Sequence, residues 1–171
     1  MILAFSTSTP QFGAALMTLE GTLLAEVATG VEHRHFQGFM PAVNFLVSSC
    51  GKPLEDIEAI VVSRGPGSFT GLRVGLAAAK GMAHGLGVSL VGVSSLEALA
   101  LRIPFSDLPV CAMLDSRKGE LFTGLYRHAR SKTMTALCKE DCIREEDLPK
   151  RIQELTVVIG NNYSRQFPLV R

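Results

Sequence analysis

The sequence lacks tryptophan and has few charged residues. Charged residues make up 19% of the 171 positions and apolar residues 47%, where a typical domain has about 25% charged residues. A chain this short with so little charge leaves apolar surface exposed, which favours a protein partner; a small, well-packed enzyme core is the alternative. The net charge of +1 provides no long-range field that would attract a nucleic acid.

Signals for metal binding, disulfides and export are also lacking. His33 and His35 are two positions apart, so on a helix they would diverge, and we expect them in a loop or at a helix start. Met1–Phe5 has no basic n-region, and the uncharged run Gly81–Leu96 is too short and too polar to span a bilayer. We therefore predict a cytoplasmic protein with no metal and no membrane contact. None of the cysteines forms a Cys-x-x-Cys pair or a zinc-type arrangement with histidine: Cys50, Cys111, Cys138 and Cys142.

The most informative stretch that is present is a glycine-rich block, Arg64–Gly75. It follows an apolar run, Ala59–Ser63, that is typical of a buried strand, and it leads into a helical pattern at Leu76–Ala83. A glycine-rich turn at a helix N-terminus suggests a phosphate-binding loop, because the first N–H groups of a helix are free. A Walker loop, however, has Lys and then Ser or Thr after its last glycine, where this chain has Leu72-Arg73.

We interpret the turn in this block as structural. Gly65 and Gly67 let the chain reverse between the strand and the helix, and Ser68 or Thr70 is expected to cap the helix. A dinucleotide fingerprint is not supported, because Ser94-Ser95 and not an acidic residue follows the next predicted strand. A protease is not supported either, since no Gly-x-Ser-x-Gly elbow surrounds Ser68.

A pattern of strand, polar turn and strand occurs twice. Residues 1–30 predict a meander of three strands, and a helix follows from about His35 to Cys50. The pattern begins again near residue 109, where Ala112–Phe122 can be laid over Ala4–Ser6 and the turn after it. We infer an internal duplication.

The duplication predicts two lobes, residues 1–105 and residues 106–171. A third helix is expected near Ser95, with Ser94 or Ser95 as its N-cap. Few residues follow Thr156–Gly160, so the second lobe has no room for closing helices. Either a tail is missing or the chain is naturally short.

The glycine-rich block, with Ala79-Lys80-Gly81 and Gly92–Ala98 after it, resembles the signature of the TsaB family. These bacterial proteins are grouped by sequence with the M22 glycoproteases. They act as the noncatalytic partner of TsaD, which makes threonylcarbamoyladenosine in tRNA beside the anticodon. The resemblance implies an α/β fold of the duplicated actin-like, sugar-kinase and Hsp70 type, which is ribonuclease H-like. It covers most of the chain, because other stretches also agree: Met1–Thr9, Arg34-His35 and Asp115–Glu120.

The resemblance also directs attention to a nucleotide site. In this superfold the first meander turn holds phosphate, and an acidic residue there holds metal-bound water. Relatives carry Asp where this chain has Ser6, which supplies no negative charge. The repeat contains Asp115 and Arg117, which we regard as candidate nucleotide contacts. We expect no independent ATP hydrolysis and no cofactor bound to the protein alone, with ATP or ADP shared with a partner complex.

Two central helices are predicted to form the partner surface. From His35 to Gly51 there is no Asp, Glu, Lys or Arg, although a helix that covers a sheet normally has a charged outer face. The second helix has small residues four apart on one side, which let another helix approach closely. The alternative is that this small face packs on the sheet or on the first helix. TsaB relatives use both helices to self-associate and to bind TsaD, which implies the interface Phe39, Met40, Val43, Val47, Gly71, Gly75, Ala79, Met82 and Ala83.

We thus predict a noncatalytic scaffold that binds a TsaD homologue. A TsaE homologue would be a further partner, the protein alone would form a homodimer, and tRNA would be contacted only through the complex. One rival is a small-molecule kinase of the same superfold, which would need a second acidic residue facing Asp115 and bound ATP. The other rival is a metallopeptidase, which would need a bound metal.

Overall fold

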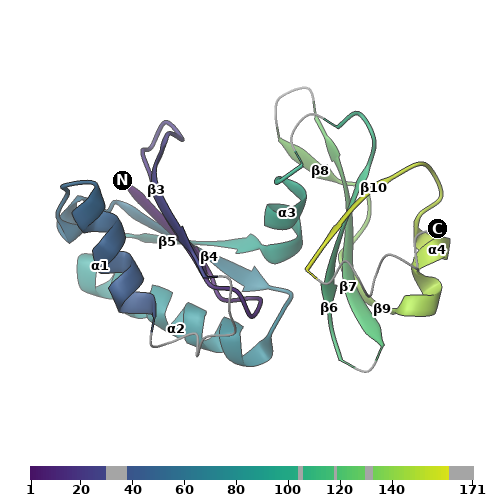
Figure 1. Ribbon diagram of the computed structural model, residues 1–171, viewed down its shortest axis with the longest axis horizontal. Coiled ribbons are helices and arrows are strands. Elements are labelled where there is room, and N and C mark those ends of the chain that lie inside the picture. Colours follow the sequence, from purple (N-terminus) through teal and green to yellow (C-terminus); the bar gives the residue numbers. More distant parts are fainter. Residues whose placement is uncertain (30–37, 104–105, 118, 130–132, 162–171) are drawn as a thin grey trace. The chain divides into compact units, whose positions relative to one another are not determined.

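The computed structural model describes residues 1–29, 38–103, 106–117, 119–129 and 133–161. The chain divides into two compact units, Met1–Val93 and Ser94–Arg171, and each unit has its own sheet (Figure 1). The Arg34-His35 pair and His33 lie outside the described residues. Among the described residues, every helix is too short or too polar to cross a lipid bilayer.

The first unit is built on a five-stranded sheet in the order β3-β2-β1-β4-β5. The central strand β1 pairs antiparallel with β2 and parallel with β4, and β2 pairs antiparallel with β3. The predicted meander and the predicted buried strand are therefore both present. The strand bounds are β1 (Ile2–Ser6), β2 (Gly13–Met17), β3 (Leu23–Ala28), β4 (Ala59–Gly65) and β5 (Ser89–Ser94).

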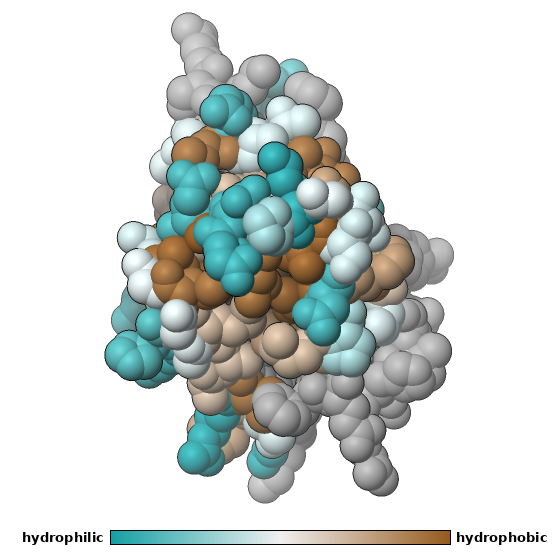
Figure 2. Space-filling model, turned by 90° about the vertical axis from the view of Figure 1, so that its left-hand side faces the viewer, coloured by the Kyte–Doolittle hydropathy of each residue, from teal (hydrophilic) through white to brown (hydrophobic). Residues whose placement is uncertain are grey.

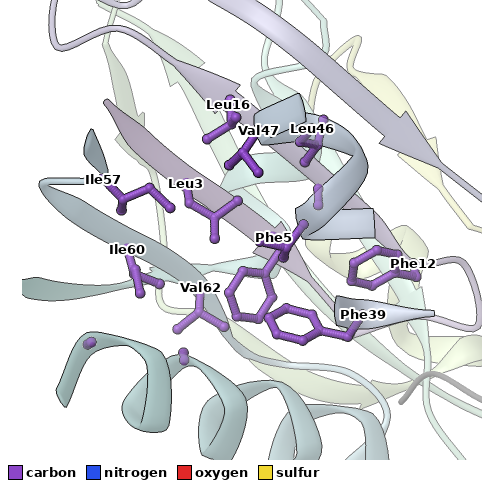
Figure 3. Packing of buried hydrophobic residues seen from close by; sticks show 14 residues of the cluster. Leu3, Phe5, Phe12, Leu16, Phe39, Leu46, Val47, Ile57, Ile60 and Val62 are labelled. Atoms are coloured by element: carbon purple, nitrogen blue, oxygen red, sulfur yellow. The ribbon is translucent and has the colours of Figure 1, made fainter. Parts of the chain in front are cut away.

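Two helices, α1 (Phe39–Ser49) and α2 (Phe69–Leu86), pack against this sheet, and a short 3-10 helix, η1 (Leu54–Asp56), precedes β4. Alternate residues of the strands meet the helices, because side chains of a strand point to opposite faces in turn. Phe5 of β1 and Phe39 of α1 form an edge-to-face pair with ring centroids 4.7 Å apart, next to Val62 (Figure 3). The core of the first unit thus lies between the sheet and these two helices.

The second unit has strands in the order β10-β6-β7-β8, with β9 also paired to β7. Its strands are β6 (Val110–Asp115), β7 (Glu120–His128), β8 (Met134–Ala136), β9 (Asp141–Arg144) and β10 (Val157–Gly160). Its helices are α3 (Ser95–Ala100), η2 (Glu145–Asp147) and α4 (Leu148–Arg151).

The strand register confirms the internal duplication. In the first unit Ile2 pairs with Met17 antiparallel and with Ala59 parallel. In the second unit Val110 pairs in the same two ways with Tyr126 and Val157. Each unit therefore repeats one arrangement of a central strand, an antiparallel neighbour and a parallel neighbour. The fold is therefore a duplicated α/β fold with one sheet in each unit, and residues 162–171 lie outside the described part of the chain.

Helix α3 belongs with the second unit, although it directly follows β5. Ser94 is its N-cap, and its hydroxyl accepts the N–H groups of Leu96 at 3.1 Å and Glu97 at 3.2 Å. Leu96 and Ala100 are fully buried in a cluster with residues of β6 and β7, including Ala112 and Tyr126. The compact units consequently divide between Val93 and Ser94, and not between residues 105 and 106 as the sequence suggested.

Candidate functional site

The glycine-rich block is hydrogen-bonded to the turn that joins β1 to β2. The N–H of Ser68 donates to the carbonyl oxygen of Ser8 at 2.7 Å, and the hydroxyl of Thr7 donates to the carbonyl oxygen of Gly71 at 2.8 Å. Thr7 is 1% exposed, so its hydrogen bond is shielded from water. The β1–β2 turn, which the family resemblance suggested as a phosphate-binding turn, is therefore packed against the start of α2.

Three glycines make this close packing possible. A Cβ atom at Gly67 would lie within 3.0 Å of Ser8, and one at Gly71 or Gly75 would lie within 3.0 Å of Thr7. Real Cβ atoms do not come that close, so only glycine fits at these positions. Gly67 also has φ of +152°, a backbone conformation that other residues rarely adopt.

Ser68 caps α2, since its hydroxyl accepts the N–H of Gly71 at 3.3 Å. Gly65 has φ of +113° at the end of β4, where the chain turns toward the helix. Thr70 is exposed in the first turn of α2. The block thus connects a strand, a turn and a helix, and its hydroxyl-bearing residue Ser68 has a structural contact.

Three hydroxyls meet at the carboxyl ends of β1 and β4. The Ser6 Oγ lies 2.9 Å from the Oγ of Ser8 and 2.9 Å from that of Ser63. In the described part of the chain these three hydroxyls bond to one another, and a hydroxyl at position 6 supplies no negative charge to hold a magnesium water shell.

Asp115 and Arg117 lie at the equivalent turn of the second unit. The N–H of Asp115 donates to the side-chain oxygen of Asn161 at 3.1 Å, which joins the ends of β6 and β10. Arg117 is exposed on the turn. Both remain predicted nucleotide contacts.

Other titratable groups of the second unit have structural partners. The hydroxyls of Ser94 and Tyr126 donate to one carboxylate oxygen of Glu140, at 2.5 and 2.6 Å. Burial, followed by this bond to Glu140, raises the pKa of Tyr126. Burial raises the pKa of the Cys111 thiol to about 12, so this cysteine is not a ready nucleophile. Among the described residues no three His, Cys, Asp or Glu side chains gather as a metal site would require.

Most residues of the predicted interface are buried in the core of the first unit. The row of small residues on α2 that we expected to face a partner, here called the inner row, consists of Gly71, Gly75, Ala79 and Ala83, and it is buried. It faces inward because the β1–β2 turn and the sheet occupy the space that a partner helix would need. Of the remaining interface residues, Met82 packs partly buried against the same core, and Met40 is 46% exposed. Phe39, Val43 and Val47 are likewise buried.

A second row of small residues, which sequence reasoning missed, lies on the opposite side of α2. This outer row consists of Ala77, Gly81 and Gly85, also four residues apart, and all three are exposed. A Cβ at Gly81 or Gly85 would meet nothing within 4 Å. The four-residue spacing is the same in both rows, so the spacing carried no signal of which one faces solvent.

Exposed apolar side chains also occur on α1 and at the start of α2. Phe45 of α1 is 58% exposed and Phe69 of α2 is 66% exposed. Seen from the side on which α1 lies, the molecule has a central hydrophobic area bordered by polar residues (Figure 2). The β2–β3 hairpin adds further exposed leucines: Leu19, Leu23 and Leu24.

Comparisons with known proteins identify relatives of this chain. A family model described as "TsaD: tRNA N6-adenosine threonylcarbamoyltransferase" matches residues 24–157. The chain is 40% identical over 127 residues to the "tRNA threonylcarbamoyladenosine biosynthesis protein TsaB" of Bacillus subtilis, and this match covers 74% of the chain and 55% of that protein. It is 31% identical to the protein of the same name in Escherichia coli, over 95% of the chain and 71% of that protein.

A solved structure has the same fold. "YeaZ from Pseudomonas aeruginosa" superposes with a TM-score of 0.81 at 26% sequence identity, and the match covers 96% of this chain and 78% of that one. The chain spans little more than half the length of the B. subtilis relative.

Proposed function

The chain belongs to the TsaB/YeaZ family, and from this premise we propose that it is a noncatalytic scaffold subunit in the synthesis of tRNA threonylcarbamoyladenosine. In this proposal it binds a TsaD homologue through the solvent-facing sides of α1 and α2. The partner carries out the transfer to adenosine, and a TsaE homologue joins the assembly. The protein contacts tRNA only through the complex and self-associates through the same helices when alone.

The observation that carries the proposal is the outer side of α1 and α2. Phe39–Ser49 contains no charged residue, and Met40 and Phe45 are exposed on it. Exposed apolar helix faces of this kind are typical of protein–protein contacts. The outer row of α2 supplies open space beside two glycines, where a partner helix can approach closely.

The polar turns support a noncatalytic role. In the first unit the position expected to carry an acid is Ser6, whose hydroxyl is engaged with those of Ser8 and Ser63. Thr7 in the same turn is packed on Gly71 and Gly75. We propose that the protein alone binds no nucleotide, and that any ATP or ADP contact through Asp115 and Arg117 arises in the partner complex.

The test is a substitution in the outer row. Gly81→Trp places a large side chain where the partner helix would approach, and we expect the variant to fold because a Cβ at Gly81 meets nothing within 4 Å. We expect the affinity for the organism's own TsaD homologue, measured by calorimetry, to fall by at least about tenfold. The matched control is Ala98→Trp, an exposed helical position of the second unit.

Because the sequence contains no tryptophan, the fluorescence of the introduced residue reports on its surroundings. The indole at position 81 becomes the sole tryptophan of the variant, and its emission should be that of a solvent-exposed ring in the free protein. Unchanged affinity for TsaD with a normally folded Gly81→Trp variant would contradict the proposed docking face.

A further inference from the structure

The two charged residues of α2, Arg73 and Lys80, have the same sign and are exposed. His84 is exposed beside them, and α2 contains no Asp or Glu. Their spacing of seven and four residues places them along one side of the helix, and we call them the basic row. In the described part of the chain none of the three pairs with a carboxylate. Arg73 instead lies over the ring of Phe69, 5.3 Å from its centroid.

The basic row runs directly beside the outer row of small residues. Ala77 and Gly81 lie within one turn of Lys80 and His84, so a helix that packs on the small residues reaches the basic ones at its edge. Packed helices approach to about 8–10 Å between axes, which is within the range of unscreened charge interactions at low salt. The uncharged α1 supplies no carboxylate to balance them.

A second copy of this chain is therefore a poor occupant of this face. A two-fold contact in which the two copies of α2 run antiparallel places both basic rows on the same side of the contact, so they approach each other. Like charges brought together at an interface oppose association and select against the wrong partner. Self-association through α2 is then weak at low salt and becomes tighter as salt screens the repulsion.

We infer that the outer side of α2 is built for a heteromeric partner, a helix whose small residues are flanked by carboxylates. The inference rests on the proposed function, which places the docking face on α1 and α2. The inference adds that the partner helix carries carboxylates. It also explains why the heterodimer would replace the homodimer, since the basic rows repel each other in the homodimer and are attracted to carboxylates in the heterodimer. Salt should consequently act in opposite directions on the two assemblies.

The experiment reverses the charge of two residues in the basic row. The variant Arg73→Glu/Lys80→Glu is compared with Arg102→Glu/Lys139→Glu, which changes the same charge at exposed positions of the second unit. At low salt the first variant should associate with the TsaD homologue at least about tenfold more slowly, and the control variant should stay within about twofold of wild type. Wild-type affinity for TsaD should fall when KCl is raised from about 50 to about 500 mM.

A mixing experiment tests whether the basic row opposes self-association of the protein. Differently tagged wild type and Arg73→Glu/Lys80→Glu should bind each other at least about tenfold more tightly than wild type binds itself, because the row then faces carboxylates. Sedimentation at low and high salt should show the wild-type dimer strengthened by salt. A wild-type dimer that weakens with salt, or no gain on mixing, would overturn the inference.

The outcomes separate the two proposals. If Gly81→Trp blocks TsaD binding and charge reversal leaves it unchanged, the docking face is right and the partner chemistry is wrong. If neither change affects binding, the face itself is wrong and both proposals fail. Because all substituted side chains are exposed, circular dichroism melts should show folded variants throughout.

Discussion

The two sides of α2 use the same residue types at the same spacing for opposite purposes. On the inner row, Gly71 and Gly75 have no Cβ because the β1–β2 turn lies where the Cβ would be. On the outer row, Gly81 and Gly85 have open space around them. A glycine inside a helix costs about 1 kcal/mol relative to alanine. On the inner side the close approach of Thr7 offsets this cost within the chain, whereas on the outer side we propose that a partner does so.

The largest effect should come from adding one methyl group on the inner row. Gly71→Ala forces a Cβ against the backbone carbonyl of Thr7, which cannot rotate away. We expect the free energy of unfolding to fall by about 3 kcal/mol, at the upper end of overpacking and despite the better helix propensity of alanine. Urea titration followed by circular dichroism measures it. An unchanged midpoint would mean that the turn does not pack on α2 as described.

A double-mutant cycle sharpens the comparison at the second inner glycine. Gly75→Ala should cost about 2 kcal/mol, because its Cβ meets the hydroxyl of Thr7. In a Thr7→Ala background that hydroxyl is gone, and the same change should cost about 1 kcal/mol less. Thr7→Ala by itself should also lose stability through its bond to the Gly71 carbonyl. Strictly additive losses would show that Thr7 and Gly75 are not in contact.

The cap of α2 provides the next smaller effect. Ser68→Ala removes the hydroxyl that accepts the Gly71 N–H and should lower the free energy of unfolding by about 1 kcal/mol. Binding to the TsaD homologue should be nearly unaffected, since the change lies outside the outer row. Full stability combined with loss of tRNA modification would instead assign Ser68 a chemical role.

On the outer row the same substitution should have the opposite sign. Gly81→Ala adds a Cβ that meets nothing, so the better helix propensity of alanine should raise the free energy of unfolding by a little under about 1 kcal/mol. Binding to the TsaD homologue should weaken, because the partner backbone can no longer approach as closely. A stabilised variant with unchanged affinity would indicate that the outer row is not at the contact.

Several features could be predicted from local sequence alone. The apolar run before Arg64 and the glycine-rich turn after it predicted β4 and the start of α2. Either Ser94 or Ser95 was expected to cap α3, and the cap is Ser94. The similarity of Ala112–Phe122 to the first meander predicted the duplication, which the register of β1 and β6 confirms. Periodicity and turn chemistry are local properties, so they can be read without knowing what the segments contact.

The partner face could not be predicted in the same way. The sequence by itself determined that α2 carries small residues at intervals of four, and it determined the family to which the chain belongs. Only the tertiary structure decided that Gly71 and Gly75 face the β1–β2 turn and that Gly81 faces solvent. It likewise decided that Leu96 of α3 packs with β6 and β7, although α3 directly follows β5. The reason is that the rotation of a helix about its axis is set by the residues it packs against, and Thr7 is more than sixty positions away from Gly71 in sequence.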